Sequence, residues 1–251
     1  MQTQNVKRAL IVGASSGIGA ELARKLAGEG YRLMLLARRE GNLKALCGRI
    51  NSEVGERRAQ FIAHDVADYQ SIPLLFAQAV DIMGGLDLVV YNSGALIPVG
   101  AQEYNFSKDL ATMQINLLGA MAWLNQAADY FQKQGAGQIV GISSVGGERG
   151  RTSAPAYNTS KAALNTYLES LRNRLARRGA HVLTVKPGFV STDMIHNAKT
   201  SFWVAPIAAA VADIWKGIRD RKQEVYTPAR WRIVGWLMRN APSFVMRRLA
   251  V

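Results

Sequence analysis

Seven short apolar segments recur along the chain, and segments with helical periodicity separate them. Strands that alternate with helices pair in parallel through right-handed crossovers. Continuous apolar runs indicate strands that are covered on both faces. The sequence therefore predicts an α/β protein with a doubly wound parallel sheet of about seven strands and helices on both faces. The expected strands are 9–14, 32–37, 59–65, 86–92, 137–143, 181–188 and 224–228, and the expected helices are roughly 17–29, 40–54, 68–83, 103–134, 155–179 and 205–221.

The sequence shows no repeat, low-complexity segment or linker, so we expect residues 1–251 to form a single domain. No run of about 20 apolar residues predicts a membrane-spanning helix, and the N-terminal segment leaves no room for a signal peptide before the first strand. A single cysteine, Cys47, excludes an internal disulfide framework. These features favour a cytoplasmic protein. The net charge of +13 favours anionic partners, which include nucleotides, nucleic acids and acidic lipids.

A glycine-rich turn, VGASSGIGA, joins the first expected strand to the first expected helix. Gly13, Gly17 and Gly19 allow a tight turn and a close approach of the backbone to a pyrophosphate. The start of the following helix supplies free N–H groups and positive partial charge. We therefore expect a dinucleotide site at this turn.

The G-x-x-x-G-x-G spacing of this turn resembles that of the short-chain dehydrogenase/reductase family, in its compact subfamily of about 250 residues. The resemblance covers nearly the whole chain and implies a Rossmann-type fold. It implies that Ser15, Ser16 and Ile18 also border the cofactor. It further implies that Asp65, beside Val66, accepts a hydrogen bond from the adenine amino group.

The same resemblance extends to the end of the fourth strand, where the family usually has Asn-Asn-Ala-Gly. Here Tyr91 and Ser93 replace the first Asn and the Ala, whereas Asn92 and Gly94 are retained. The resemblance implies that Asn92 and Gly94 brace the sheet and the cofactor.

Two arginines follow the second strand, where a sheet of this kind meets the adenosine ribose. An acidic residue at this point grips the ribose hydroxyls of NAD, whereas Arg38 and Arg39 can hold a phosphate through charge-assisted hydrogen bonds. The pair predicts NADP(H) as the cofactor. One alternative is that one of them, Arg39 more readily, only solvates the start of a helix.

Tyr157 and Lys161 lie about one helical turn apart, so both side chains leave the same face. A ketone that receives a hydride needs a proton on its oxygen, and the usual tyrosine pKa of about 10 is high for that task. A nearby ammonium group favours the phenolate and is expected to lower the pKa of Tyr157.

The resemblance completes this group with Ser144, thirteen positions before Tyr157, and with Asn116. It implies that Ser144 polarises the carbonyl oxygen and that Lys161 also holds the nicotinamide ribose. It implies that Asn116 holds a water that links Lys161 to solvent.

The sixth strand leads into KPGFVSTDM. The resemblance implies that Pro187 and Gly188 turn the chain under the nicotinamide, with Val190 beside it, and that Thr192 bonds the carboxamide. Lys186 is expected on the surface.

A short lid is expected at about 193–205, with Met194, Phe202 and Trp203 as apolar contributors and His196 on its surface. A compact apolar lid favours a hydrophobic carbonyl substrate.

A basic amphipathic tail is expected at about 229–251, in two short helical pieces separated at Pro242. Arginines and tryptophans alternate in it, and no acidic residue follows Glu224. Such a segment can lie in the interface of an anionic membrane. The alternative is that it packs on its own subunit or on a partner.

The leading hypothesis is an NADP(H)-dependent oxidoreductase acting on carbonyl/alcohol pairs, with a Ser-Tyr-Lys(-Asn) site and no metal. One alternative is a non-catalytic NADP-binding sensor, and another is a reductase of a lipid-linked keto-sugar. Epimerases and dehydratases among the longer relatives carry a larger substrate domain, for which this chain is too short. No recognition helix for a nucleic-acid groove can be identified in the sequence, which argues against nucleic acid as the partner. The resemblance also implies a homodimer or homotetramer built on the two long helices, 103–134 and 155–179.

Overall fold

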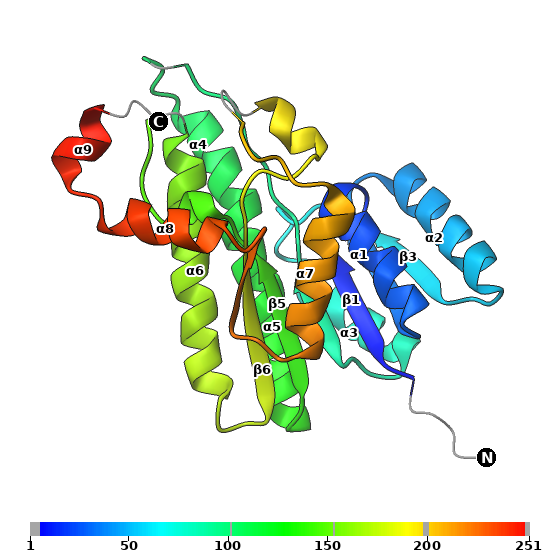
Figure 1. Cartoon of the computed structure of the whole chain (residues 1–251). Helices are drawn as coiled ribbons and strands as arrows, with labels where there is room; N and C mark the ends of the chain where they lie inside the picture. Colours follow the sequence, from blue (N-terminus) through cyan, green and yellow to red (C-terminus); the bar gives the residue numbers. More distant parts are fainter. Residues whose placement is uncertain (1–5, 101, 153, 198–200, 249–251) are drawn as a thin grey trace.

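The computed structural model describes residues 6–100, 102–152, 154–197 and 201–248 (Figure 1). Within them, seven parallel strands form one sheet in the order β3-β2-β1-β4-β5-β6-β7. This confirms the predicted doubly wound sheet. The strands are β1 Arg8–Val12, β2 Arg32–Ala37, β3 Ala59–Ala63, β4 Leu88–Tyr91, β5 Gly137–Ile142, β6 Ala180–Pro187 and β7 Glu224–Thr227.

The direction of strand addition reverses between β1 and β4. The chain first moves from β1 outward to β3, then returns to β4 beside β1 and moves outward in the other direction. Loops on the two sides of this switch point diverge at the carboxyl ends of the strands. The divergence leaves a crevice in which ligands of such sheets bind.

Helices cover both faces of the sheet. One face packs on α1, α2 and α7, and the other packs on α3, α5 and α6. In Figure 1, α1 and α7 lie in front of the sheet. The helices are α1 Gly17–Gly28, α2 Glu40–Val54, α3 Ile72–Met83, α4 Phe106–Met113, α5 Gly119–Gln134, α6 Pro155–Leu175, α7 Ile207–Arg219, α8 Trp231–Asn240 and α9 Ser243–Arg248.

Strand β1 shows how the apolar runs produce this layering. Ala9 and Ile11 point to the first face, whereas Leu10 and Val12 point to the second, and all four are fully buried. Successive strand residues face opposite sides of a sheet, so only a continuous apolar run fits a strand that is covered on both sides.

The helix expected at 103–134 differs in its detail. It begins at Phe106 and contains a π-helical turn, η1 (Gln114–Leu118), between α4 and α5. The buried Tyr91 hydroxyl donates to the carbonyl of Ile115 within this turn (2.6 Å). A π-helical turn inserts a residue into the helical repeat and changes which side chains face inward.

The tail contains α8 and α9, which are separated at Pro242 as expected. Figure 1 shows α8 crossing beside the upper part of α6, with α9 extending away from the sheet. Trp231 is buried, so part of the tail packs on its own chain. Its last three residues lie outside the described part of the structure. Among the described helices, none has both the length and the apolarity needed to cross a bilayer.

Candidate active site

A cavity of ≈ 1140 Å³ opens at the carboxyl ends of the strands. It extends from the glycine turn, across the switch point, to the lid and α8. All but two of the site residues predicted from the sequence border it. These are Gly13, Ser15, Ser16, Gly17, Ile18, Arg38, Arg39, Asp65, Val66, Asn92, Gly94, Ser144, Tyr157, Lys161, Pro187, Gly188, Val190 and Thr192. The two that do not are Gly19 and Asn116.

The glycine turn leaves no room for a side chain at Gly13 or Gly19. Gly13 has a φ of 90°, and a Cβ on it would lie 2.5 Å from the nitrogen of Ser93. A Cβ on Gly19 would lie 2.2 Å from the carbonyl oxygen of Gly13. Gly19 therefore serves the packing of α1 against the turn, which explains why it does not border the cavity. Asn92 closes the same contact from β4, because its Nδ2 donates to the carbonyl of Gly13 (2.8 Å).

The first turn of α1 is open to an anion. Ser16 occupies the N-cap position but its side chain makes no capping hydrogen bond, and the first turn carries no acidic residue. The N–H groups of a helix start need partners, and the helix dipole favours a negative group there. This end of the cavity can therefore hold a phosphate.

Arg38 and Arg39 stand at the outer end of the cavity. Arg39 donates to the hydroxyls of Ser15 (3.1 Å) and Ser16 (2.6 Å), which ties the end of β2 to the glycine turn. Arg38 lies 3.5 Å from the carboxylate of Asp65, and the Arg38 side chain is the more exposed of the two. Two guanidinium groups and two hydroxyls thus converge where the adenosine end of a dinucleotide would lie.

Ser144, Tyr157 and Lys161 come together in the same cavity. Ser144 follows β5, and its Oγ accepts a hydrogen bond from Gly146 in a short 3₁₀ turn, η2 (Val145–Gly147). Pro155 starts α6, so Tyr157 lies in the first helical turn and Lys161 in the second. Tyr157 and Ser144 both border the cavity here. The Lys161 Nζ lies 5.9 Å from the centre of the Tyr157 ring and donates to the carbonyl of Ile142 (3.0 Å).

The pKa values of this pair differ from the expectation. Burial raises the pKa of Tyr157, against the opposing effects of its hydrogen bond to Ser144 and of the charge of Arg151. Burial also lowers the pKa of Lys161 to about 8. The prediction that Lys161 lowers the pKa of Tyr157 is therefore wrong. The reason is that burial of Tyr157 disfavours its charged phenolate more strongly than its neighbours favour it.

Asn116 lies behind the cavity and is fully buried. Its Oδ1 accepts from the nitrogen of Ala95 (2.7 Å), and its Nδ2 donates to the carbonyl of Ala95 (2.9 Å) and to Ser160 Oγ (3.0 Å). The side chain thus joins the π-helical turn to a loop of the cavity wall and to the residue before Lys161. Its role in holding a water remains a prediction.

The turn after β6 is covered by α8. A Cβ on Gly188 would lie 2.1 Å from the indole nitrogen of Trp231, so only glycine allows this contact. Thr192 faces the glycine turn, since its Cγ2 lies 3.1 Å from the position of a Cβ on Gly17. In the lid, η3 (Asp193–Asn197) brings Met194 to the cavity, and His196 is exposed as expected. Residues 198–200 of the predicted lid lie outside the described part of the structure.

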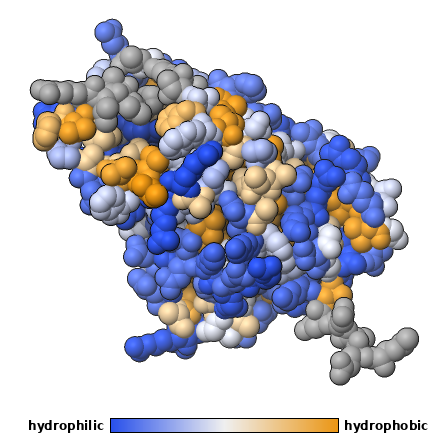
Figure 2. Space-filling view, in the orientation of Figure 1, coloured by the Kyte–Doolittle hydropathy of each residue, from blue (hydrophilic) through white to orange (hydrophobic). Residues whose placement is uncertain are grey.

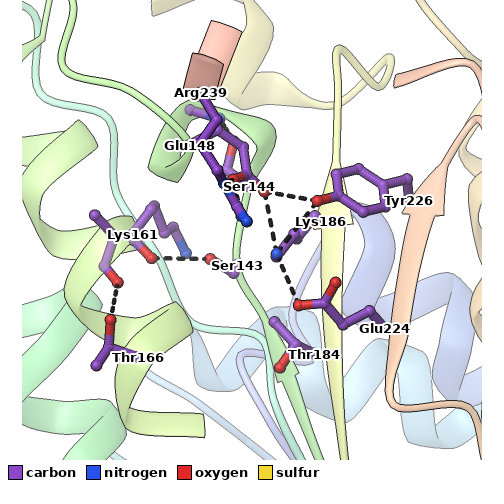
Figure 3. Close-up of polar contacts among 12 residues, drawn as sticks. Ser143, Ser144, Glu148, Lys161, Thr166, Thr184, Lys186, Glu224, Tyr226 and Arg239 are labelled. Atoms are coloured by element: carbon purple, nitrogen blue, oxygen red, sulfur yellow. Dashed lines mark hydrogen bonds and ion pairs between the residues drawn. The ribbon is translucent and has the colours of Figure 1, made fainter. Parts of the chain in front are cut away.

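Lys186 is not on the surface, and that expectation is wrong. Its side chain is 2% exposed, and its Nζ lies 3.0 Å from Glu148 Oε1 and 2.8 Å from Glu224 Oε1. Figure 3 shows this group beside Ser144, with Tyr226 and Arg239 completing the partners of Glu148. The sequence around a lysine does not indicate whether carboxylates from distant segments will form ion pairs with it.

Several cavity residues were not predicted from the sequence. They include Arg151, the apolar loop 95–99 after β4, and Trp231 and Met238 of α8. The apolar run ALIPV directly after a strand was a usable signal for the loop. Nothing local indicates that a helix more than 70 residues after Tyr157 returns to the cavity.

The sheet order and the glycine turn at its switch point define the class of Rossmann-like α/β proteins. A family model described as short chain dehydrogenase matches residues 7–201. An uncharacterised oxidoreductase of Mycobacterium tuberculosis is 32% identical over 97% of this chain and 97% of its own length. The ketoacyl reductase HetN of Nostoc sp. is 30% identical over 90% of this chain and 79% of its own. The chain therefore belongs to the short-chain dehydrogenase/reductase family of oxidoreductases.

Two solved structures are similar to this one. A short-chain dehydrogenase from Sphingobium yanoikuyae in complex with NADPH has a TM-score of 0.82 and 24% identity, over 91% of this chain and 92% of that one. An actinorhodin polyketide ketoreductase variant with NADPH has a TM-score of 0.71 and 32% identity, over 89% of this chain and 80% of that one. At 24% identity the first similarity speaks for the fold alone.

Proposed function

We propose that this protein is an NADP(H)-dependent oxidoreductase that interconverts a hydrophobic carbonyl compound and its alcohol. The observation that carries the proposal is a single cavity with two distinct ends. One end has the glycine turn with two arginines, and the other has Ser144, Tyr157 and Lys161. A nucleotide that spans the cavity would lie with one end in each group.

The residues present fit NADP(H). The open first turn of α1 suits the pyrophosphate, and Arg38 and Arg39 suit the 2′-phosphate. The related polyketide ketoreductase structure contains NADPH, which supports the same cofactor here. When bound, the cofactor supplies or accepts the hydride.

Ser144 and Tyr157 act on the substrate oxygen in this proposal. Both side chains border the same part of the cavity, so a carbonyl oxygen placed between their hydroxyls could accept from both. The Ser144 hydroxyl polarises the carbonyl, and the Tyr157 hydroxyl donates the proton as negative charge develops on the oxygen. In the oxidative direction the same phenol takes the proton back.

Lys161 and Asn116 support this proton transfer. Lys161 has a pKa of about 8, so it exchanges a proton near neutral pH. Its ammonium form would hold the ribose hydroxyls and restore the proton of Tyr157. Asn116 bonds the residue before Lys161 and a loop of the cavity wall, and this keeps both at fixed positions.

The substrate end of the cavity is apolar. Ile97, Val145, Met194, Phe189 and Trp231 border it, and these side chains favour a hydrophobic ketone over a polar sugar. The names of two relatives, a ketoacyl reductase and a polyketide ketoreductase, agree with this substrate class.

A panel of ketones and alcohols, read by NADPH absorbance and repeated with NADH, tests the proposal. We expect turnover of hydrophobic ketones with a preference for NADPH. Tyr157→Phe should lower kcat about 10²- to 10⁴-fold, the contribution of a positioned general acid. Tyr104→Phe is the matched control, because that ring is 99% exposed.

Full activity in Tyr157→Phe would contradict the assignment of the proton donor. NADPH binding without turnover of any panel member would instead favour the non-catalytic sensor. The panel includes a lipid-linked keto-sugar, so that this alternative substrate is tested in the same assay.

A further inference from the structure

The outward face of α8 is apolar. Trp231 and Gly235 face the protein and are buried. Ile233, Trp236 and Leu237 are 67%, 63% and 55% exposed. Their spacing of three and four residues places them on one side of the helix. Figure 2 shows hydrophobic residues exposed on the part of the surface formed by α8 and α9.

This stripe continues onto the lid and onto α9. Phe202 and Trp203 are about half exposed, and both rings contact Trp231, with centroids 5.2 Å and 6.1 Å from its ring. Phe244 of α9 is 60% exposed. We call the whole set the tail surface, which comprises Phe202, Trp203, Ile233, Trp236, Leu237 and Phe244. Several large apolar side chains exposed on neighbouring elements indicate an interaction site.

The charges beside the tail surface are positive. Arg230 lies over the Trp203 ring (5.2 Å to its centre), and Arg232 and Arg247 are exposed. Arg239 is paired with Glu148, and no acidic residue follows Glu224 in the sequence. Two copies of this surface would bring arginines against arginines, whereas anionic lipid complements them. Tryptophan and arginine are also the residues that suit a membrane interface.

The inner side of the same helix borders the cavity. Trp231 and Met238 line it, so α8 separates the substrate end of the cavity from the tail surface. A helix that lies on a bilayer with its outer side would therefore hold the cavity next to the lipid.

We propose that the tail surface docks on an anionic lipid bilayer and so places the substrate end of the cavity at the membrane face. The docking stands on the tail surface itself, whereas the delivery of an apolar substrate from the lipid rests on the function proposed above. Arg232 supplies electrostatic attraction, and Ile233, Trp236 and Leu237 supply the inserted apolar area.

Co-sedimentation of the full chain with vesicles tests the docking. Vesicles of phosphatidylcholine with phosphatidylglycerol are compared with vesicles of phosphatidylcholine alone. We expect binding to the anionic vesicles, reduced about tenfold or more by Arg232→Glu and by the triple change Ile233→Gln, Trp236→Gln and Leu237→Gln. Arg49→Glu on α2 and Leu74→Gln on α3 are the controls, because both positions are exposed and lie far from α8 in the sequence. Both controls should bind as the wild type does.

Equal binding to both kinds of vesicle, or unchanged binding of the triple variant, would overturn the proposal. The proposal would also be overturned if the wild type did not bind vesicles but formed a larger assembly than the triple variant. The tail surface would then be a contact between subunits. Turnover of a water-soluble ketone in vesicle-free buffer is measured in parallel. Loss of vesicle binding with this turnover intact, together with an unchanged melting temperature, shows that the changes act on docking. Vesicle binding without any turnover would contradict only the proposed function.

Discussion

Lys161 is a lysine whose surroundings lack the solvent that an ammonium group needs. Its side chain passes beneath Tyr157 to the carbonyl of Ile142, and it is 4% exposed. Burial lowers its pKa from 10.5 to about 8, which costs folding free energy at neutral pH. Burial of Lys161 thus lowers the stability of the fold. It also lets Lys161 exchange a proton near neutral pH, as the proposed reaction requires.

This cost predicts a pH dependence of stability. Between pH 8 and 10.5 the unfolded chain holds the proton on Lys161 and the folded chain does not. The free energy of unfolding should therefore rise with pH across this window, by at most about 3 kcal/mol from this group. Lys161→Met should remove that rise, and urea unfolding at pH 7.5 and pH 10 measures it. Lys44→Met, an exposed position on α2, is the control.

An identical rise in the wild type and in Lys161→Met would show that the amine is not desolvated in the folded protein. Other groups titrate in the same window, so the comparison between the variants carries the result.

The turn that follows β5 connects three elements through one buried carboxylate. Glu148 accepts hydrogen bonds from Tyr226 of β7 (2.7 Å) and from Arg239 Nε of α8 (2.9 Å), and it is ion-paired with Lys186 of β6. Burial raises the pKa of Glu148, but these partners outweigh it and the pKa is lowered. The network therefore fixes α8 relative to Ser144, four residues before Glu148.

Removing one member of this network should be costly. Lys186→Met leaves Glu148 buried with fewer partners, and we expect a loss of about 3–5 kcal/mol in the free energy of unfolding. Glu148→Gln should lower it in a similar way, and the double variant should lose less than the sum of the two. A double-mutant cycle by urea unfolding measures the coupling. Strictly additive losses would mean that the two side chains do not interact.

On the scale of the whole molecule, the described surface also exposes apolar side chains along α4 and η1. Phe106 is 78% exposed, and Leu110 and Leu118 are about 40% exposed, along α4 and η1. We propose that this side, with α5 and α6, forms the contact of a homodimer, one of the two assemblies, homodimer or homotetramer, expected on the two long helices.

Leu110→Glu combined with Leu118→Glu should then halve the mass of the assembly, because buried like charges oppose association. Light scattering after size-exclusion chromatography measures the mass, and Leu74→Glu on α3 is the control. A wild type that already runs as a monomer would refute the proposed contact.

The layered sheet, its glycine turn and the shared helix face of Tyr157 and Lys161 could be predicted from local sequence patterns, because apolar runs and helical periods are properties of short segments. Ser144 could be assigned only through the resemblance to the family. Parallel strands also place their carboxyl ends at one edge, so residues that follow different strands meet there without any knowledge of packing.

The positions of Lys186, Asn116 and α8 were decided only by the tertiary structure. Lys186 is buried because Glu148 and Glu224, 38 residues away on either side, meet it across β6 and β7. Asn116 lies behind the cavity because the Tyr91 hydroxyl bonds the π-helical turn, and α8 reaches the cavity because Gly188 leaves room for Trp231. A local sequence pattern records a residue's own preferences, whereas burial and pKa are set by neighbours that come from distant parts of the chain.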